Sequence, residues 1–232
     1  MTKEAKLMSC WLERVRPARS VLIRRSVVVG LVVTAMLGGA LTGSAWASDA
    51  STAKTLVLKR ADVGSAYTGA ELGPSSVTLA DFALCVGRPV PNRVVTANVR
   101  GLSFTDQKSG STIASTVDIV KTRAMALADR AVVSDPKFPG CLEQSLNAPG
   151  ASAVAQLVNL KKYGTFTIAH MVKADLVVNG QAASFTDIDI YIHTNRAEIH
   201  VAFVTVGTQP FDQKQAQAIL DKLNVRIKAA KV

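Results

Sequence analysis

The stretch SFTDIDIYIHTNRAEIHVAFVTV, residues 184–206, decides the fold. Apolar and polar residues alternate on both sides of Asn195-Arg196, which is the pattern of two half-buried strands joined by a tight turn. A two-residue loop there pairs Ile192 with Ile199 and brings the apolar residues of both strands to one face. The sequence therefore predicts an antiparallel hairpin with one apolar face.

More strands precede the hairpin. They are expected over residues 94–104, 112–121, 154–162 and 166–178, and the hairpin itself comprises 184–194 and 197–206. A two-residue loop at Asn179-Gly180 would put Asp187 opposite the apolar positions of the strand before it. A three-residue loop over 179–181 pairs Val172 with Ile188 instead. We predict the longer loop, because it keeps one face apolar.

Helical segments lie before, between and after these strands. We expect a short helix at 78–85, a longer one capped by Thr122 and running to about residue 133, and a short piece at 140–146. Asp212 and Gln215 form the start of the last helix. Its buried stripe comprises Ala216, Leu220, Leu223 and Ile227. These patterns predict an α+β, two-layer domain, in which an antiparallel meander sheet is covered on one face by the two long helices.

The first 47 residues have the organisation of a secretory signal peptide. A basic segment, residues 14–25, precedes an apolar run, residues 26–41, and the small-residue pattern Ala45-Trp46-Ala47 follows. We predict cleavage after Ala47, a short flexible tether over 48–55 and a single exported domain over 56–232. The alternative is an uncleaved anchor, because the apolar stretch is long enough to cross a bilayer, which takes about 20 residues.

The cysteine count follows from export. Cys10 would leave with the signal peptide, which leaves Cys85 and Cys141. Two cysteines in an oxidising compartment most often pair, so we predict a disulfide between them. Closing a loop of this length stabilises the fold by about 4 kcal/mol in the chain-entropy model. A metal site is less well supported, because no histidine flanks either cysteine, and so is a nucleophilic thiol outside the cell.

Composition and charge exclude several classes of protein. The 232 residues are 48% hydrophobic and 19% charged, which is ordinary globular usage and excludes collagen, coiled coil and low-complexity disorder. The net charge is +10, but residues from 48 onward carry only +5. That balance does not indicate a nucleic-acid partner. Attraction to anionic lipid headgroups or wall polymers remains open.

Residues able to do chemistry are few. No nucleophile elbow, phosphate-binding loop, zinc-protease motif or paired-cysteine motif is present, so neither a cofactor nor a metal is predicted. His170 is expected on the core side of its strand. The hairpin register gathers five polar residues on the sheet face opposite the helices: Asp189, Tyr191, His193, Glu198 and His200. They form either a metal or general-base site or an ordinary solvated sheet face.

An apolar wall is the second candidate site. It combines residues of the hairpin with residues of the last helix: Ile188, Ile190, Val201, Phe203, Leu220 and Leu223. Such a wall either borders a pocket for a lipid or small molecule or closes a tight core.

The order of elements resembles a family, the exported sensor-type domains of actinobacteria. These domains occur outside the membrane on some serine/threonine kinases and as secreted or lipid-anchored proteins. The resemblance spans roughly residues 54–230 and rests on the pair Cys85 and Cys141, on the segment 124–129 and on 187–206. It implies binding of a ligand or of an envelope component.

The function expected from the sequence is therefore an exported cell-envelope binding or sensor-like module without catalytic activity. Its partner would be a small molecule, a lipid or an envelope component. A structural or protein-interaction component of the envelope is the first alternative, and an exported hydrolase is the second.

Overall fold

The computed structural model describes residues 43–72, 78–146, 151–178, 181–207 and 211–230. The expected signal peptide lies almost wholly outside the described residues. The helices are α2 (Gly43–Leu56), α3 (Arg60–Val63), α4 (Leu79–Val86), α5 (Arg123–Val133), α6 (Phe138–Leu146) and α7 (Gln213–Ala229). The strands are β1 (Tyr67–Glu71), β2 (Val95–Arg100), β3 (Leu102–Asp106), β4 (Thr112–Val120), β5 (Ser152–Val158), β6 (Phe166–Val178), β7 (Gln181–Thr194) and β8 (Ala197–Val206).

All strands join one antiparallel sheet in the order β1-β3-β4-β8-β7-β6-β5, with β2 paired to β4. The last four strands form the expected meander, and the α+β class is confirmed. The strand expected over 94–104 is divided into β2 and β3 at Gly101. The Gly101 amide donates to the Ser115 carbonyl (2.8 Å), and a Cβ at Gly101 would lie 2.9 Å from Ser115 Oγ. A side chain at this corner would therefore collide with β4.

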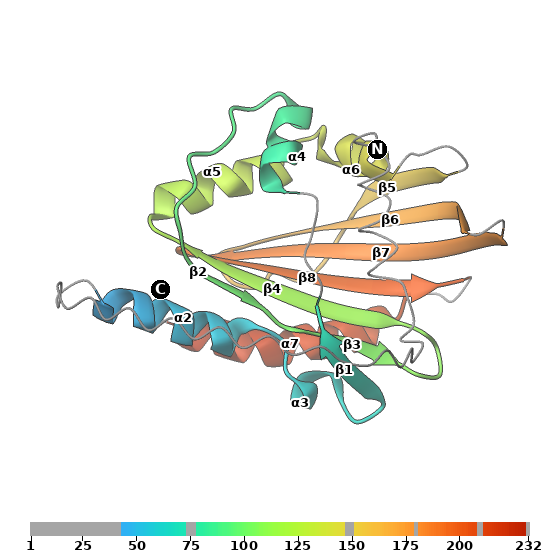
Figure 1. The fold of residues 1–232 in the computed structure, drawn as a ribbon, viewed down its shortest axis with the longest axis horizontal. Coiled ribbons are helices and arrows are strands. Elements are labelled where there is room, and N and C mark those ends of the chain that lie inside the picture. Colours follow the sequence, from blue (N-terminus) through green and yellow to red (C-terminus); the bar gives the residue numbers. More distant parts are fainter. Residues whose placement is uncertain (1–42, 73–77, 147–150, 179–180, 208–210, 231–232) are drawn as a thin grey trace, which may run out of the picture.

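Helices cover both faces of the sheet (Figure 1). Helices α2 and α7 lie on one face, while α4, α5 and α6 lie on the other. This differs from the expected arrangement, in which the two long helices, α5 and α7, shared one face. The reason lies in β6, where the positions on the second face of the sheet, expected to face solvent, are apolar. A second layer of helices packs on them, and Val172 contacts Val132 and Val133 of α5.

The β6–β7 register corrects the predicted three-residue loop. Val178 pairs with Gln181, so two residues separate the strands, and Val172 pairs with Asp187. The residues of the loop itself lie outside the described part of the chain. The prediction was wrong because it assumed that only one face of the sheet is buried. With both faces covered, Val172 and Asp187 share the buried face beneath helices α4 to α6.

The β7–β8 hairpin follows the predicted register. Ile192 pairs with Ile199, and Ile190 with Val201. Asn195 adopts a positive φ of 52°, which suits a tight hairpin turn.

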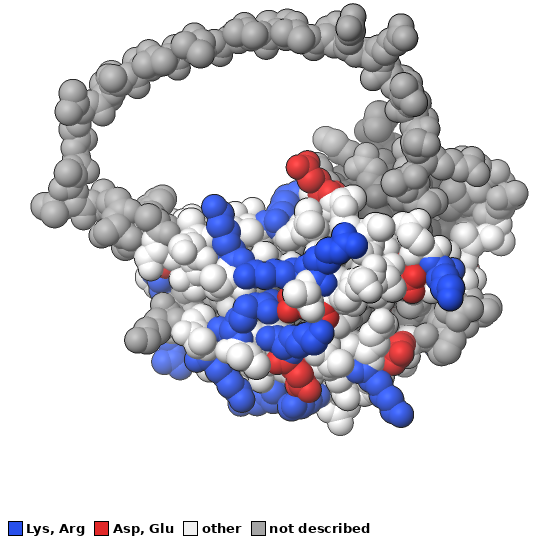
Figure 2. All heavy atoms as spheres, turned by 90° about the horizontal axis from the view of Figure 1, so that it is seen from below, with Lys and Arg blue, Asp and Glu red and all other residues white. Residues whose placement is uncertain are grey.

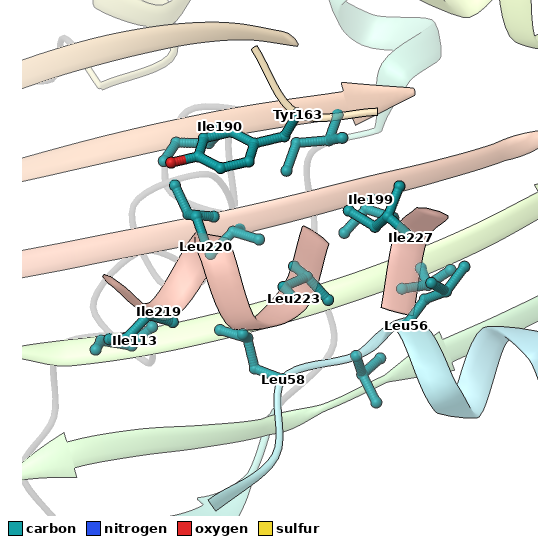
Figure 3. Close-up of a cluster of buried hydrophobic side chains, with 14 of the residues drawn as sticks. Leu56, Leu58, Ile113, Tyr163, Ile190, Ile199, Ile219, Leu220, Leu223 and Ile227 are labelled. Atoms are coloured by element: carbon teal, nitrogen blue, oxygen red, sulfur yellow. The ribbon is translucent and has the colours of Figure 1, made fainter. Parts of the chain in front are cut away.

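The main core lies between the sheet and helices α2 and α7 (Figure 3). Ile190 and Ile199 of the sheet face Leu220 and Leu223 of α7 there. The Asp212 side chain caps α7 by accepting from the Gln215 amide (2.9 Å), as predicted. All six residues of the expected apolar wall are buried in this core: Ile188, Ile190, Val201, Phe203, Leu220 and Leu223.

Residues 48–55, for which a flexible tether was expected, form most of α2. The helix is held by packing and by charge. Ala53 is fully buried in the main core, and Asp49 pairs with Arg196 of the β7–β8 turn (2.7 Å). The apolar spacing of α2 is weak in the sequence, so only these tertiary contacts identify it as part of the domain.

The predicted disulfide between Cys85 and Cys141 is present, with the Cα atoms 5.9 Å apart. It joins the end of α4 to α6. The bridge therefore ties together two of the helices that cover the second face of the sheet.

Candidate functional site

A cavity of about 460 Å³ lies between the sheet and helices α4, α5 and α6. Strands β2, β4, β7 and β8 supply its floor, and α4 and α6 supply most of its roof. The cavity is on the face opposite the main core. None of the six residues of the expected apolar wall borders it.

The floor follows the two-residue period of the strands. Even-numbered residues of β4 and β8 and odd-numbered residues of β7 point to it. All five residues of the expected polar site are therefore brought together in the cavity lining: Asp189, Tyr191, His193, Glu198 and His200. The face is not solvated as an ordinary sheet face would be, because three helices cover it.

The centre of the floor holds a histidine–carboxylate pair. His200 Nε2 donates to Asp189 Oδ1 (2.6 Å). The Tyr191 ring stacks on the His200 ring, with centroids 4.9 Å apart. The carboxylate fixes the orientation of the imidazole ring.

One end of the floor is a buried charge cluster around Arg93. Its guanidinium donates to Asp129 of α5 (2.7 Å), to Glu198 of β8 (2.7 Å) and to Asp118 of β4. Burial works against the charged form of Arg93, but the neighbouring acidic side chains, Asp118 first among them, outweigh it and raise the pKa of Arg93. The cluster joins α5 to two strands of the sheet.

Glu198 is the neutral member of this cluster. Burial, together with a hydrogen bond to Asp129 and the charge of that carboxylate, raises the pKa of Glu198 to about 9, although Arg93 acts in the opposite direction. At neutral pH Glu198 therefore holds a proton and shares it with Asp129. The Arg93 guanidinium also binds the carboxyl groups of Asp118 and Asp129.

His193 lies beside the charge cluster and pairs with Glu198 in the β7–β8 register. It is 7% exposed, and the Phe166 ring packs against it edge-on at 5.7 Å. Burial, with the charges of Arg130 and Arg93, lowers the pKa of His193 to about 4. The imidazole is therefore neutral. Its buried Nδ1 has no hydrogen-bond partner among the described residues.

His170 is buried beneath α5 and α6 and does not border the cavity. Its Nε2 lies 3.0 Å from the Val133 carbonyl, so this nitrogen carries the proton and donates it. Burial lowers the pKa of His170. This hydrogen bond links β6 to α5, in keeping with a structural role for His170.

The roof is apolar. It consists of side chains from α4, α5 and α6: Leu79, Phe82, Val133, Leu142 and Leu146. Phe82 packs on Phe138 (4.9 Å), whose ring also meets the edge of Tyr191 from the floor (5.8 Å). The cavity therefore has one apolar wall and one polar wall.

Several lining residues were missed at the level of sequence. Arg93 lies in a segment without periodicity, and nothing in its neighbourhood signals a role. Asp129 did leave a signal, since it occupies a buried position of α5 between Ala126 and Val132. A carboxylate within an apolar helical stripe indicates a buried partner.

Among the described residues there is no group of three or more metal-ligating side chains. Within the same residues, every helix is too short or too polar to cross a membrane.

No protein-family model matches this chain, and no curated protein matches it in sequence. One solved structure that it resembles is the extracellular domain of PknH from Mycobacterium tuberculosis. The identity is 16%, the match covers 76% of this chain and 96% of that one, and the TM-score is 0.44. The resemblance is weak, concerns the fold alone and carries no argument about function.

Proposed function

We propose that this protein is an exported envelope module that binds a small amphiphilic molecule between the sheet and helices α4 to α6 without transforming it. The observation that carries the proposal is the cavity itself. Its volume of about 460 Å³ lies within the range of ligand sites, roughly 300–1,000 Å³. Its combination of an apolar roof and a polar floor suits a ligand with the same two-sided character.

The charges of the floor favour one class of ligand. The lining contains four aspartates, Asp118, Asp129, Asp187 and Asp189, against two arginines, Arg93 and Arg100. Glu198 is protonated and adds no charge. This excess of acidic side chains disfavours an anionic group and favours a neutral or cationic one. The apolar part of the ligand would lie against Leu79, Phe82 and Leu142.

The titratable groups support binding more than turnover. Glu198 is committed to Asp129 and Arg93, and His193 is neutral and enclosed. The His200–Asp189 pair is the arrangement that favours the alternative, an exported hydrolase, because a carboxylate-oriented imidazole is a general-base device. Replacing His193 and His200 together by Ala tests it. A hydrolytic activity that disappears in this folded double variant would make the enzyme assignment correct.

Binding can be tested with three probes that share a dodecyl chain: dodecyltrimethylammonium, dodecyl maltoside and dodecyl sulfate, each below its micelle concentration. Titration calorimetry should show saturable binding of the cationic and neutral probes and weaker binding of the sulfate. Ala114→Phe, on the floor, should fill the cavity and abolish binding. Val154→Phe, at an exposed position of β5, is the matched control and should not change it.

Two outcomes would contradict the proposal. One is the absence of saturable binding for all three probes. The other is equal binding by the Ala114→Phe variant and the wild type, because the probes would then occupy another surface. Circular dichroism of each variant separates a filled cavity from an unfolded chain.

Export is the second part of the proposal, and the fold is compatible with cleavage after Ala47. Asp49, which pairs with Arg196, lies after that site and would be retained. Intact-mass measurement of the exported protein should show a chain that begins at Ser48. A full-length chain in the membrane fraction would instead support the uncleaved anchor.

A further inference from the structure

The excess of positive over negative charge in the domain is located on one face. We define the basic face as residues 48–63, 159–165 and 211–230, which include most of α2, all of α3 and α7, and the turn before β6. These segments contain nine Lys or Arg against four Asp, whereas the remaining residues from 48 onward contain eleven of each sign. The whole excess of +5 thus belongs to the basic face, which Figure 2 shows from the α7 side.

The segments of the basic face are joined into one surface. Arg226 of α7 donates to the Thr55 carbonyl of α2 (2.8 Å) and pairs with Asp62 of α3 (2.7 Å). Lys161 pairs with Asp221 of α7 (2.8 Å). The face is therefore held by α7 as a single unit.

Two of the four acids of the basic face are turned inward: Asp49 pairs with Arg196, and Asp62 is buried beside Arg226. Asp212, the α7 cap, and Asp221, which pairs with Lys161, are exposed. The exposed cations are distributed over all the segments: Lys54, Lys59, Arg60, Lys162, Lys214 and Lys228. The surface that a partner meets therefore carries an excess of positive charge, with a few acidic side chains among the basic ones (Figure 2).

Helix α7 adds an apolar element to this charge. Lys214, Lys222, Val225 and Lys228 share the outward side of the helix, opposite the buried stripe that contains Leu220. Val225 is 70% exposed and has lysines on both sides of it. A helix with an outward apolar residue flanked by lysines is typical of one that lies in the headgroup region of a bilayer.

We propose that the basic face lies against a bilayer that contains anionic lipid. Charge complementarity is the first reason. The position of the face in the chain is the second: the apolar run of residues 26–41 ends two residues before Gly43, where α2 begins. Since such a run is the segment that enters a membrane during export, the chain leaves the bilayer directly into this face. The ligand cavity, on the other face of the sheet, is then directed away from the lipid.

The proposal can be tested by co-sedimentation of the full chain with vesicles of phosphatidylcholine, alone or mixed with phosphatidylglycerol. The quantity compared is the ratio of the two partition coefficients. Residues 1–47, with their basic segment and apolar run, are the same in every variant, so their contribution cancels when the ratios of variant and wild type are compared. The wild type should bind the anionic vesicles more tightly, and the gain should fall as salt is added. Each lysine near the surface contributes about a fivefold gain.

A pair of charge-matched triple variants locates the effect. Lys54→Gln, Lys214→Gln and Lys228→Gln together should reduce the gain about 100-fold. Lys108→Gln, Arg123→Gln and Lys137→Gln remove the same charge from exposed positions outside the basic face and should leave most of the gain. Binding of the dodecyl probes should be unchanged in both, so a failure here does not bear on the cavity.

Three results would overturn the assignment. Equal losses in both triple variants would mean that net charge alone attracts the protein to lipid. No gain from phosphatidylglycerol in the wild type would remove the bilayer as a partner. Binding of soluble polyphosphate as tight as that of the vesicles, and lost in the first triple variant, would assign the face to a polyanion instead.

Discussion

Replacing Glu198 by Gln tests the protonation of the buried cluster around Arg93. Glutamine has nearly the shape of a protonated glutamate, so its amide can donate to Asp129 and accept from Arg93 as the neutral acid does. The Glu198 side chain is only 12% exposed, which leaves little solvent screening. The Glu198→Gln variant should therefore keep the fold while removing one titratable group from the cluster.

The sign and size of the effect follow from the pKa of Glu198, which rises from 4.5 to about 9 on folding. Above its ordinary pKa the unfolded chain releases this proton and the folded chain keeps it. The contribution of Glu198 to stability is therefore fully present at acid pH and is lost as pH rises toward 9. The slope is about 1.4 kcal/mol per pH unit, or up to about 4 kcal/mol between about pH 5 and about pH 8.

Urea unfolding followed by far-ultraviolet circular dichroism measures this slope. The free energy of unfolding of the Glu198→Gln variant, relative to the wild type, should increase steadily from about pH 5 to about pH 8. Glu71→Gln, at an exposed position of β1, controls for the loss of a carboxyl group. A difference between wild type and Glu198→Gln that does not change with pH would show that Glu198 does not hold the proton.

Three further experiments test the packing and cross-links of the fold. Cys85→Ser with Cys141→Ser should lower the free energy of unfolding by about 4 kcal/mol, and a loss below about 1 kcal/mol in urea would contradict the chain-entropy estimate. Arg93→Met leaves buried carboxyl groups without their partner and should lower the free energy of unfolding by about 3–5 kcal/mol at neutral pH. An unchanged urea midpoint would mean that the cluster is solvated. Leu220→Ala in the main core should cost about 2–5 kcal/mol, whereas Val225→Ala, on the exposed side of the same helix, should cost less than about 0.5 kcal/mol; thermal unfolding of the two variants checks this contrast.

The strand pattern was sufficient to predict one hairpin and insufficient for the other. In the β7–β8 hairpin the isoleucines ending at Ile192 can meet the apolar set beginning at Ile199 only through a two-residue loop, so parity settles the register. In the β6–β7 hairpin the same argument from odd and even positions predicted the wrong loop length, because Val172 pairs with Asp187 on a second buried face. Nothing local to β6 shows that helices will cover that face.

The candidate site was predictable to a similar extent. Alternation alone placed Asp189, Glu198 and His200 on one side of the sheet, and the structure brings them together there. Their burial was not predictable, since it depends on α4 to α6 and on Arg93, a residue from a segment without a pattern. Parity within a strand is a local property, whereas the layer that covers a strand is a tertiary one.

Strands β7 and β8 therefore separate two roles by parity. On one side Ile190 and Ile199 pack against α7, where any polar substitution would leave an unsatisfied group in the main core. On the other side Asp189 and His200 are held by a mutual hydrogen bond and by Tyr191, and the cavity lies above them. Buried carboxylates on that side stabilise the fold less than apolar residues would, because their desolvation offsets much of their pairing energy. Their presence in a covered position, with room for a ligand beside them, is accounted for by recognition of a ligand better than by stability.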